Sequence, residues 1–126
     1  YAHHPTEIKV TLEVAAGLER RTIAIFQPHR YTRTKMLLSK FGSAFEKTDI
    51  LLLTNIYAAG ENPIPGMDGE LLFEKVKQKR RKATYYFANF RKIIDFLGCE
   101  CREGDLILTL GAGNINEVGR SFLNRE

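Results

Sequence analysis

The fold is decided by TIAIFQPHRYTRT (residues 22–34), where an apolar run ends in a proline and then in basic residues. Residues 22–26 are typical of a buried strand, and a helical pattern follows. His29, Arg30 and Arg33 therefore fall in the turn and the first helical turn after a strand. Because a helix N-terminus already carries partial positive charge, guanidinium groups there are repelled unless an anion lies nearby. The stretch predicts a site for a carboxylate or a phosphate.

Seven further helices and strands are expected along the chain. Apolar residues recur at helical spacing, or form short continuous runs of the kind found in strands that are covered on both faces. Alternating strands and helices imply right-handed crossovers and a mainly parallel sheet with helices on both faces, a Rossmann-like α/β domain of three layers. Helices are expected at 5–16, from Thr32 with Leu37, Leu38, Phe41, Ala44 and Phe45 on one side, at 69–79, at 90–97 and after Gly113, and strands at 50–53, 84–87 and 106–110.

The expected strand order is third, second, first, fourth, which places the site. In this order the chain reverses direction between the first and fourth strands, and ligands of open α/β sheets bind beyond the carboxyl ends at such a switch point. Residues 27–33 and the turn at 111–114 would then face each other across a crevice. The long connection at 56–68 contains two prolines and two glycines, with Gly69 just after it, so we expect it to be ordered but irregular.

The composition of the chain limits its size class and its ligands but does not identify its function. A chain of 126 residues with 44% hydrophobic residues is the size of one ordinary domain and can bury a core. Its formal net charge of +4 favours acidic ligands without demanding nucleic acid. Charges interrupt every apolar run well short of the roughly 18 residues needed to span a bilayer, so no membrane segment is expected.

Arg30 and Arg33 are three positions apart, so on one helical turn they would project from one face and could hold a single carboxylate. The alternative is a pair of surface arginines, or arginines paired with acidic groups of a neighbouring domain. Their position at a strand end favours the anion site. His29 could donate a hydrogen bond or carry a proton near neutral pH, and packing against the turn is an equally good interpretation.

The opening segment places His3 and His4 directly before a helix start, with Glu7 one turn further on. This order lacks the spacing of zinc motifs, and no third ligand is evident. Helix capping or substrate contact is therefore the preferred interpretation, and no metal site is expected. Cys99 and Cys101 are interpreted as ordinary thiols.

A turn formed by Gly111, Ala112 and Gly113 lies between a strand and a helix, which is the context of a phosphate-binding loop. Asn116 replaces the third glycine of G-x-G-x-x-G, so a tight turn with close backbone approach explains these glycines at least as well. The motif G-x-x-x-x-G-K-[ST] does not occur. This chain is therefore not expected to bind a nucleoside triphosphate in the manner of a P-loop.

The densest basic run is KVKQKRRK at residues 75–82. We interpret it as the solvated end of a helix, where cations suit the negative pole. A stand-alone basic module that binds nucleic acid or other anions is the second hypothesis for the chain, although nucleic-acid binding is not expected.

Four motifs together resemble the C-terminal domain of the Mur ligase family. They are YAHHPTEI at 1–8, FQPHRYTRT at 26–34, TNIYAAGENPIPG at 54–66 and LTLGAGNI at 108–115. Their order and spacing are compatible with the family, and the likeness spans nearly the whole chain. The second motif is the most distinctive, and it favours the member that adds L-alanine to UDP-N-acetylmuramate over the related ligase that attaches a recycled tripeptide.

The resemblance implies a three-domain cytoplasmic bacterial enzyme of peptidoglycan synthesis, and so of cell-wall biogenesis, cell shape and cell division. ATP would phosphorylate the muramate carboxylate, and the alanine amine would attack the acyl phosphate. The UDP-sugar domain and the central ATPase domain, which would bind ATP and Mg²⁺, are expected to be absent from residues 1–126. This closing domain would then act only with the remaining ligase domains, bind no cofactor of its own and be inactive in isolation.

The resemblance also implies roles for particular residues. Arg30 and Arg33 would hold the carboxylate of the incoming L-alanine or steady developing charge. The residues expected to line the same pocket are Tyr1, His3 and His29, with Ala112 and its flanking glycines Gly111 and Gly113 as the opposite wall.

Overall fold

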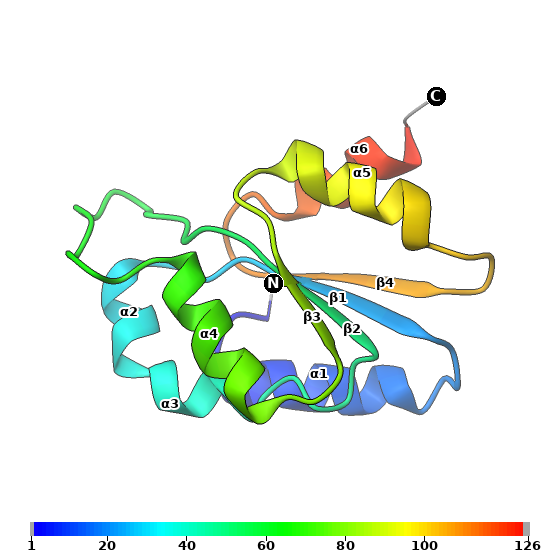
Figure 1. Cartoon of the computed structure of the whole chain (residues 1–126), viewed down its shortest axis with the longest axis horizontal. Helices are drawn as coiled ribbons and strands as arrows, with labels where there is room; N and C mark the ends of the chain where they lie inside the picture. The colour runs from blue at the N-terminus through cyan, green and yellow to red at the C-terminus, as the bar shows by residue number, and fades with distance from the viewer. Residues whose placement is uncertain (1, 125–126) are drawn as a thin grey trace.

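The computed structural model describes residues 2–124 as a four-stranded parallel sheet with helices on both faces (Figure 1). The sheet order is β3-β2-β1-β4, so the expected class, strand direction and strand order are confirmed. The strands are β1 (Thr22–Phe26), β2 (Ile50–Leu53), β3 (Ala83–Tyr86) and β4 (Leu106–Leu110). The helices are α1 (Pro5–Ala16), α2 (Tyr31–Met36), α3 (Leu38–Phe41), α4 (Gly69–Lys79), α5 (Phe90–Glu100) and α6 (Asn116–Leu123).

The central strand β1 is buried along its whole length and divides the core in two. Successive side chains of a strand point to opposite faces of the sheet. Ala24 and Phe26 accordingly belong to one hydrophobic cluster, and Ile23 and Ile25 belong to the other. The apolar residues from Ile23 to Phe26 are therefore required, because both faces of the strand are covered.

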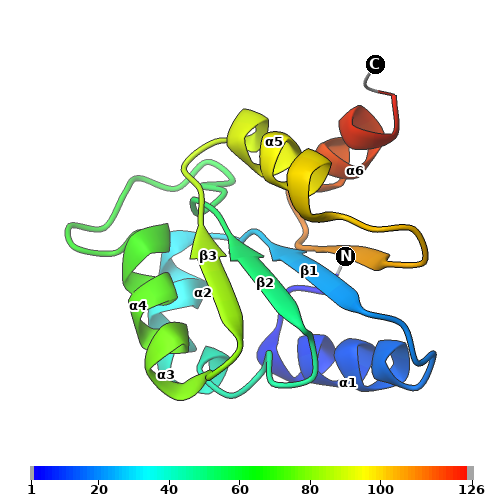
Figure 2. The ribbon, with the colours of Figure 1, turned by 45° about the vertical axis from the view of Figure 1, so that its right-hand side comes forward.

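Helices α1, α3 and α4 cover one face of the sheet, and α5 and α6 cover the other (Figure 2). Helices α1 and α4 bury apolar residues at helical spacing against one face of the sheet, and α5 and α6 do so against the other face. Within residues 2–124, no helix combines the length and the apolar character needed to cross a membrane. The helical residues of the two hydrophobic clusters are Ile8, Leu12, Phe41, Leu72 and Val76 on one face and Ile93, Leu97 and Val118 on the other.

The single helix expected from Thr32 is instead two short helices, α2 and α3, that meet at Leu37. Leu37 has φ −103° and ψ 9°, outside the helical range. The rings of Phe41 and Phe45 pack on Phe26 with centroid distances of 5.3 and 5.2 Å. Packing against the sheet thus redirects the chain, although the apolar pattern along it is continuous.

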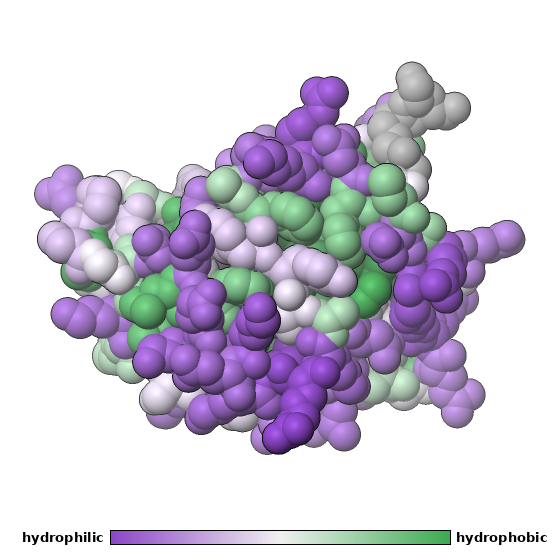
Figure 3. Space-filling view, in the orientation of Figure 1, coloured by the Kyte–Doolittle hydropathy of each residue, from purple (hydrophilic) through white to green (hydrophobic). Residues whose placement is uncertain are grey.

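Strand β3 forms one edge of the sheet, and it starts and ends one residue earlier than expected. Its residues alternate between exposed and half-buried. Tyr85 is 41% exposed, and its ring packs 4.9 Å from the ring of Phe96 on α5. Figure 3 shows a band of hydrophobic residues across the middle of this face, bordered by hydrophilic side chains.

Arg80 interrupts the basic run, because its guanidinium is buried rather than solvated. The residue is 5% exposed, and Nη1 donates to the carbonyl of Phe45 at 2.5 Å. Nη2 donates to the carbonyls of Asp49 at 3.0 Å and Ala83 at 3.2 Å, and Nε donates to the Thr84 hydroxyl at 2.9 Å. Burial lowers the pKa of Arg80 to about 10. The expectation of a solvated run is wrong at this position, where Arg80 joins the segments at the starts of β2 and β3.

Replacing Arg80 with methionine removes these four hydrogen bonds, which join the residue to three backbone carbonyl groups and to the Thr84 hydroxyl. We expect Arg80→Met to lower the free energy of unfolding by about 3 kcal/mol, measured by urea denaturation. Arg81→Met, at the exposed neighbouring position, is the matched control and should change it by less than about 0.5 kcal/mol. Equal unfolding midpoints for the two variants would show that the buried guanidinium does not stabilise the fold.

Candidate functional site

The loops that follow β1 and β2 are joined beyond the carboxyl ends of these strands. The backbone N–H of Tyr57 donates to the carbonyl of Pro28 at 2.8 Å. The N–H of Arg30 in turn donates to the carbonyl of Tyr57 at 2.8 Å, which makes a parallel bridge between His29 and Tyr57. The segment that carries the basic residues is therefore fixed by the neighbouring loop and not by its own strand alone.

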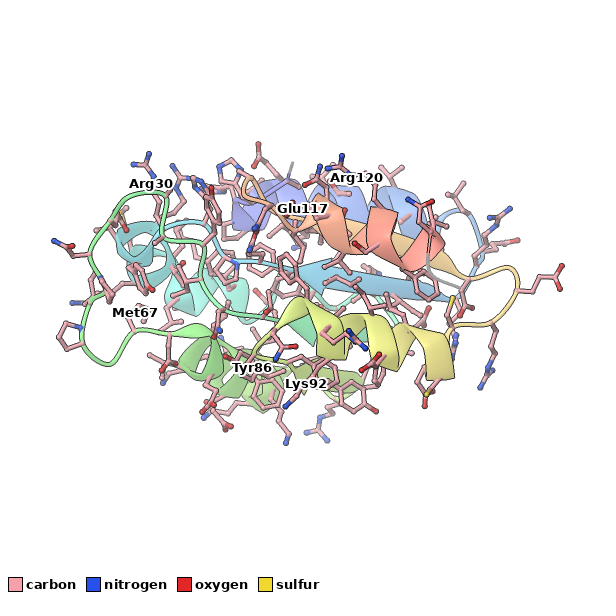
Figure 4. All side chains as sticks on the ribbon, turned by 90° about the horizontal axis from the view of Figure 1, so that it is seen from above. Arg30, Met67, Tyr86, Lys92, Glu117 and Arg120 are labelled. Atoms are coloured by element: carbon pink, nitrogen blue, oxygen red, sulfur yellow. The ribbon has the colours of Figure 1, made fainter. Side chains whose placement is uncertain are left out.

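Arg30 is the N-cap residue of α2, and its backbone is left-handed with φ 70°. This conformation is uncommon for a residue with a side chain. It is maintained by the bond to Tyr57 and by Thr34, whose hydroxyl donates to the Arg30 carbonyl at 2.7 Å. Figure 4 shows Arg30 at the end of the molecule where the loop after β2 and the start of α2 lie together. The two arginines thus do not share the first helical turn, because Arg30 precedes the helix and Arg33 lies within it.

Both arginines nevertheless act on His29. Arg33 Nη1 lies 3.5 Å from His29 Nδ1. Burial lowers the pKa of His29, and the positive charges of Arg33, His3 and Arg30 lower it further. Since a guanidinium can only donate, a hydrogen bond between these two groups requires Nδ1 of His29 to be the acceptor. The structure therefore brings His29, Arg30 and Arg33 into one electrostatic cluster.

The negative charge predicted at the start of α2 is supplied by Glu61 of the same chain. Glu61 Oε1 accepts from the backbone N–H groups of Tyr31 at 2.6 Å and Thr32 at 3.2 Å. Its Oε2 accepts from the Thr32 hydroxyl at 2.5 Å, and this hydroxyl is the main reason that the pKa of Glu61 is lowered. The expectation that this position requires a foreign anion is corrected, because a carboxylate from the loop after β2 already caps the helix.

Three rings form a row beside this cluster. The centroids of His3 and His29 lie 5.7 Å apart, and those of His29 and Tyr57 lie 5.8 Å apart. The last two rings are stacked, with 14° between their planes. The structure thus places His3 next to His29 as expected, while Tyr1 lies outside the described residues.

The glycine turn after β4 packs directly on this arrangement. Gly111 has φ 144°, and a Cβ there would lie 2.8 Å from the carbonyl oxygen of Gln27. A Cβ on Gly113 would lie 2.6 Å from Cγ of Tyr57. Close backbone approach therefore requires both glycines, with Ala112 half-buried between them. The crevice expected between the two segments is closed here, because Gly111 touches Gln27 and the ring of Tyr57 lies against Gly113.

Gln27 is 5% exposed and lies beneath this contact. Its Nε2 donates to Oδ1 of Asn114 at 2.8 Å, and its backbone N–H donates to the carbonyl of Leu110 at 3.0 Å. Its Oε1 has no hydrogen-bond partner among the residues that the structure describes. A buried carbonyl oxygen without a partner costs about 1–3 kcal/mol.

His4 serves the helix and not the site. Its Nδ1 accepts from the N–H of Thr6 at 3.3 Å, and Glu7 Oε1 accepts from the N–H of His4 at 3.1 Å. This capping box confirms the capping interpretation of the opening segment. Over the described range 2–124, no group of three or more His, Cys, Asp or Glu side chains could hold a metal ion.

Sequence reasoning missed four residues of the site, namely Gln27, Tyr57, Glu61 and Asn114. A signal was available for two of them, because the connection at 56–68 follows a strand whose carboxyl end borders β1. The rule that placed the basic residues at a strand end applies equally to Tyr57 and Glu61. Gln27 and Asn114 lie within the quoted motifs, but their pairing depends on the sheet bringing the two turns together.

The sequence and the fold both match known proteins. Residues 1–113 match the family described as Mur ligase, glutamate ligase domain. A UDP-N-acetylmuramate–L-alanine ligase of Geotalea daltonii is 48% identical over 126 residues, which cover 99% of this chain and 28% of the relative. The ligase of the same name from Brachyspira hyodysenteriae is 46% identical over 127 residues, with 99% and 27% covered. The chain thus spans little more than a quarter of the length of these relatives.

Two solved structures superpose over nearly the whole chain. The UDP-N-acetylmuramate-alanine ligase MurC of Thermotoga maritima gives a TM-score of 0.78 at 25% identity, covering 99% of this chain and 25% of that chain. A murein peptide ligase of Psychrobacter arcticus gives a TM-score of 0.75 at 20% identity, covering 98% and 25%, and this likeness shows the fold alone. Family model, relatives and fold agree, and the chain belongs to the Mur ligase family.

Proposed function

We propose that this chain is the domain of an alanine-adding ligase that holds L-alanine while it is joined to UDP-N-acetylmuramate. The observation that carries the proposal is the meeting of Arg30, Arg33 and His29 at the switch point of the sheet, where such sheets bind ligands. Relatives 41–48% identical, named UDP-N-acetylmuramate–L-alanine ligase, support the choice of amino acid.

The cluster suits a carboxylate ligand. Among residues 2–124, the structure shows no ion pair between Arg30 or Arg33 and a carboxylate, because Glu61 bonds to the backbone and hydroxyl groups of α2. Guanidinium groups bind carboxylates through charge-assisted hydrogen bonds. The neutral ring of His29 adds a third donor at Nε2. These groups would hold the carboxylate of the amino acid and leave its amine directed away from them.

Positioning is the contribution that the proposed reaction asks of this domain. ATP transfers its γ-phosphoryl group to the muramate carboxylate, and the amine of alanine attacks the acyl carbon. The C–N bond forms, the bond from carbon to the phosphate oxygen breaks, and the amine loses a proton. Fixing the carboxylate of alanine orients the amine for this attack. We assign the binding of ATP and Mg²⁺ to the remainder of the ligase, because this chain contains no P-loop motif.

The proposed partners are the remaining ligase domains and the substrates UDP-N-acetylmuramate, L-alanine and ATP. Because a UDP sugar and ATP are consumed, the proposed place of action is the bacterial cytoplasm, where the product serves peptidoglycan synthesis. The structure gives no support to a nucleic-acid module. Its basic run is divided, since Arg80 is buried and Lys82 Nζ donates to the carbonyl of Glu46 at 3.1 Å.

Removal of either guanidinium tests the carboxylate site in the full-length ligase. We expect Arg30→Ala and Arg33→Ala each to lower kcat/KM for L-alanine by about 100-fold, since each removes a charge-assisted contact. The measurement is alanine-dependent phosphate release. Arg91→Ala, at an exposed arginine of α5, should behave like wild type. Near-normal kinetics for both site variants would refute the assigned role.

The electrostatic coupling within the cluster can be measured in the isolated domain. Because the positive charge of Arg33 disfavours the imidazolium form, Arg33→Ala should raise the pKa of His29 toward its ordinary value. The pKa is followed by NMR titration of the His29 ring protons, with Arg120→Ala on α6 as the remote control. A His29 pKa that is the same in both variants would show that the arginine does not act on this ring.

A further inference from the structure

The ring of Tyr57 lies at the centre of the site, although Tyr57 belongs to none of the groups expected there. Tyr57 follows β2, yet its ring packs on the turn after β4, and β1 lies between these two strands. A Cβ on Gly113 would lie 2.6 Å from Cγ and 2.9 Å from Cδ1 of the ring. The ring therefore reaches across the carboxyl end of β1, which is the switch point of the sheet.

Tyr57 is held firmly in this place. Its backbone N–H and carbonyl are bonded to Pro28 and Arg30, and its ring stacks on His29 with 14° between the planes. Gly113 packs against the ring from another side. The residue is still 38% exposed, so part of the ring remains accessible to a ligand. A ring that is fixed on two sides and open on a third forms a rigid wall.

A ligand carboxylate bound by Arg33 and His29 brings the rest of an amino acid to this wall. The side chain of an α-amino acid begins about 2.5 Å from the carboxylate carbon, because only two bonds separate them. Nδ1 of His29 lies 3.5 Å from Nη1 of Arg33. The ring of Tyr57 stacks on the ring of His29. The first atoms beyond a carboxylate held there would therefore lie near the ring that stacks on His29.

We propose that Tyr57 is a specificity-determining residue that restricts the ligase to amino acids with a small side chain. The inference rests on the proposed function and names the group that selects the substrate. A methyl group fits against the ring, whereas a branched side chain collides with it. The packing of the ring against Gly113 limits its movement. Selection therefore comes from a steric clash that the glycine turn makes rigid.

Truncation of the ring in the full-length ligase tests the proposal. In Tyr57→Ala, the ratio of kcat/KM for L-valine to that for L-alanine should rise at least about tenfold over wild type, because pocket contacts of one or two methyl groups discriminate by this order. Tyr57→Phe keeps the ring and should keep the wild-type ratio. Tyr85→Ala removes the same atoms from a tyrosine of similar exposure on β3 and should also keep it.

The outcomes separate this proposal from the proposed function. A wild-type ligase that does not use L-alanine overturns the proposed function itself. Normal use of L-alanine with an unchanged ratio in Tyr57→Ala overturns the role of Tyr57 alone. If Tyr57→Ala does not fold, as judged by its thermal melt, Tyr57→Leu preserves apolar packing and applies the same criterion, with an unchanged ratio again contradicting the proposal.

Discussion

The carboxylate of Glu61 is the interaction on which the geometry of the carboxyl edge depends. The start of α2 presents unpaired N–H groups next to two guanidinium groups, and all of these are positive. Glu61 bonds to Tyr31 and Thr32, so the helix can begin there without a bound ligand. The arginine side chains are then left for a ligand. The proposed anion site would thus be assembled before any ligand binds, because the carboxylate of Glu61 offsets the positive charges gathered at this helix start.

This constraint couples three loops that are distant in the sequence. Glu61 and Tyr57 come from the loop after β2, the basic residues follow β1, and the glycine turn follows β4. Hydrogen bonds and ring packing join all three over the end of the central strand. In a parallel sheet the carboxyl ends of the strands lie at one edge, so these contacts need only short loops. The burial of β1 on both faces holds this edge in place.

Much of the fold follows from local patterns. Strands β1, β2 and β4 and helices α1 and α4 have the bounds expected from their apolar runs and from turn residues such as Pro5. The break at Leu37 is not visible locally, because it arises when Phe41 and Phe45 turn onto Phe26. Burial of Arg80 has the same origin, since the carbonyl groups that it binds come from other segments.

The basic residues of the site were predictable from the local sequence, whereas for Tyr57 and Glu61 the sequence offered only their place after a neighbouring strand. A strand end followed by His29, Arg30 and Arg33 is a local signal. Glu61 and Tyr57 act on these residues only after β1 and β2 pair, so no spacing in the sequence reveals the contact. The expectation of an open crevice was wrong for the same reason. The ring of Tyr57 fills the space beside Gly113 only once the sheet has brought the loops after β1, β2 and β4 together.

The central claim is that the carboxyl edge of this domain binds the carboxylate of the acceptor amino acid. A crystal structure of the full-length ligase with L-alanine bound tests it most directly. We predict that the carboxylate of alanine lies within hydrogen-bond distance of a guanidinium group of Arg30 or Arg33, next to His29. A carboxylate bound elsewhere, with both arginine side chains directed into solvent, would contradict the account.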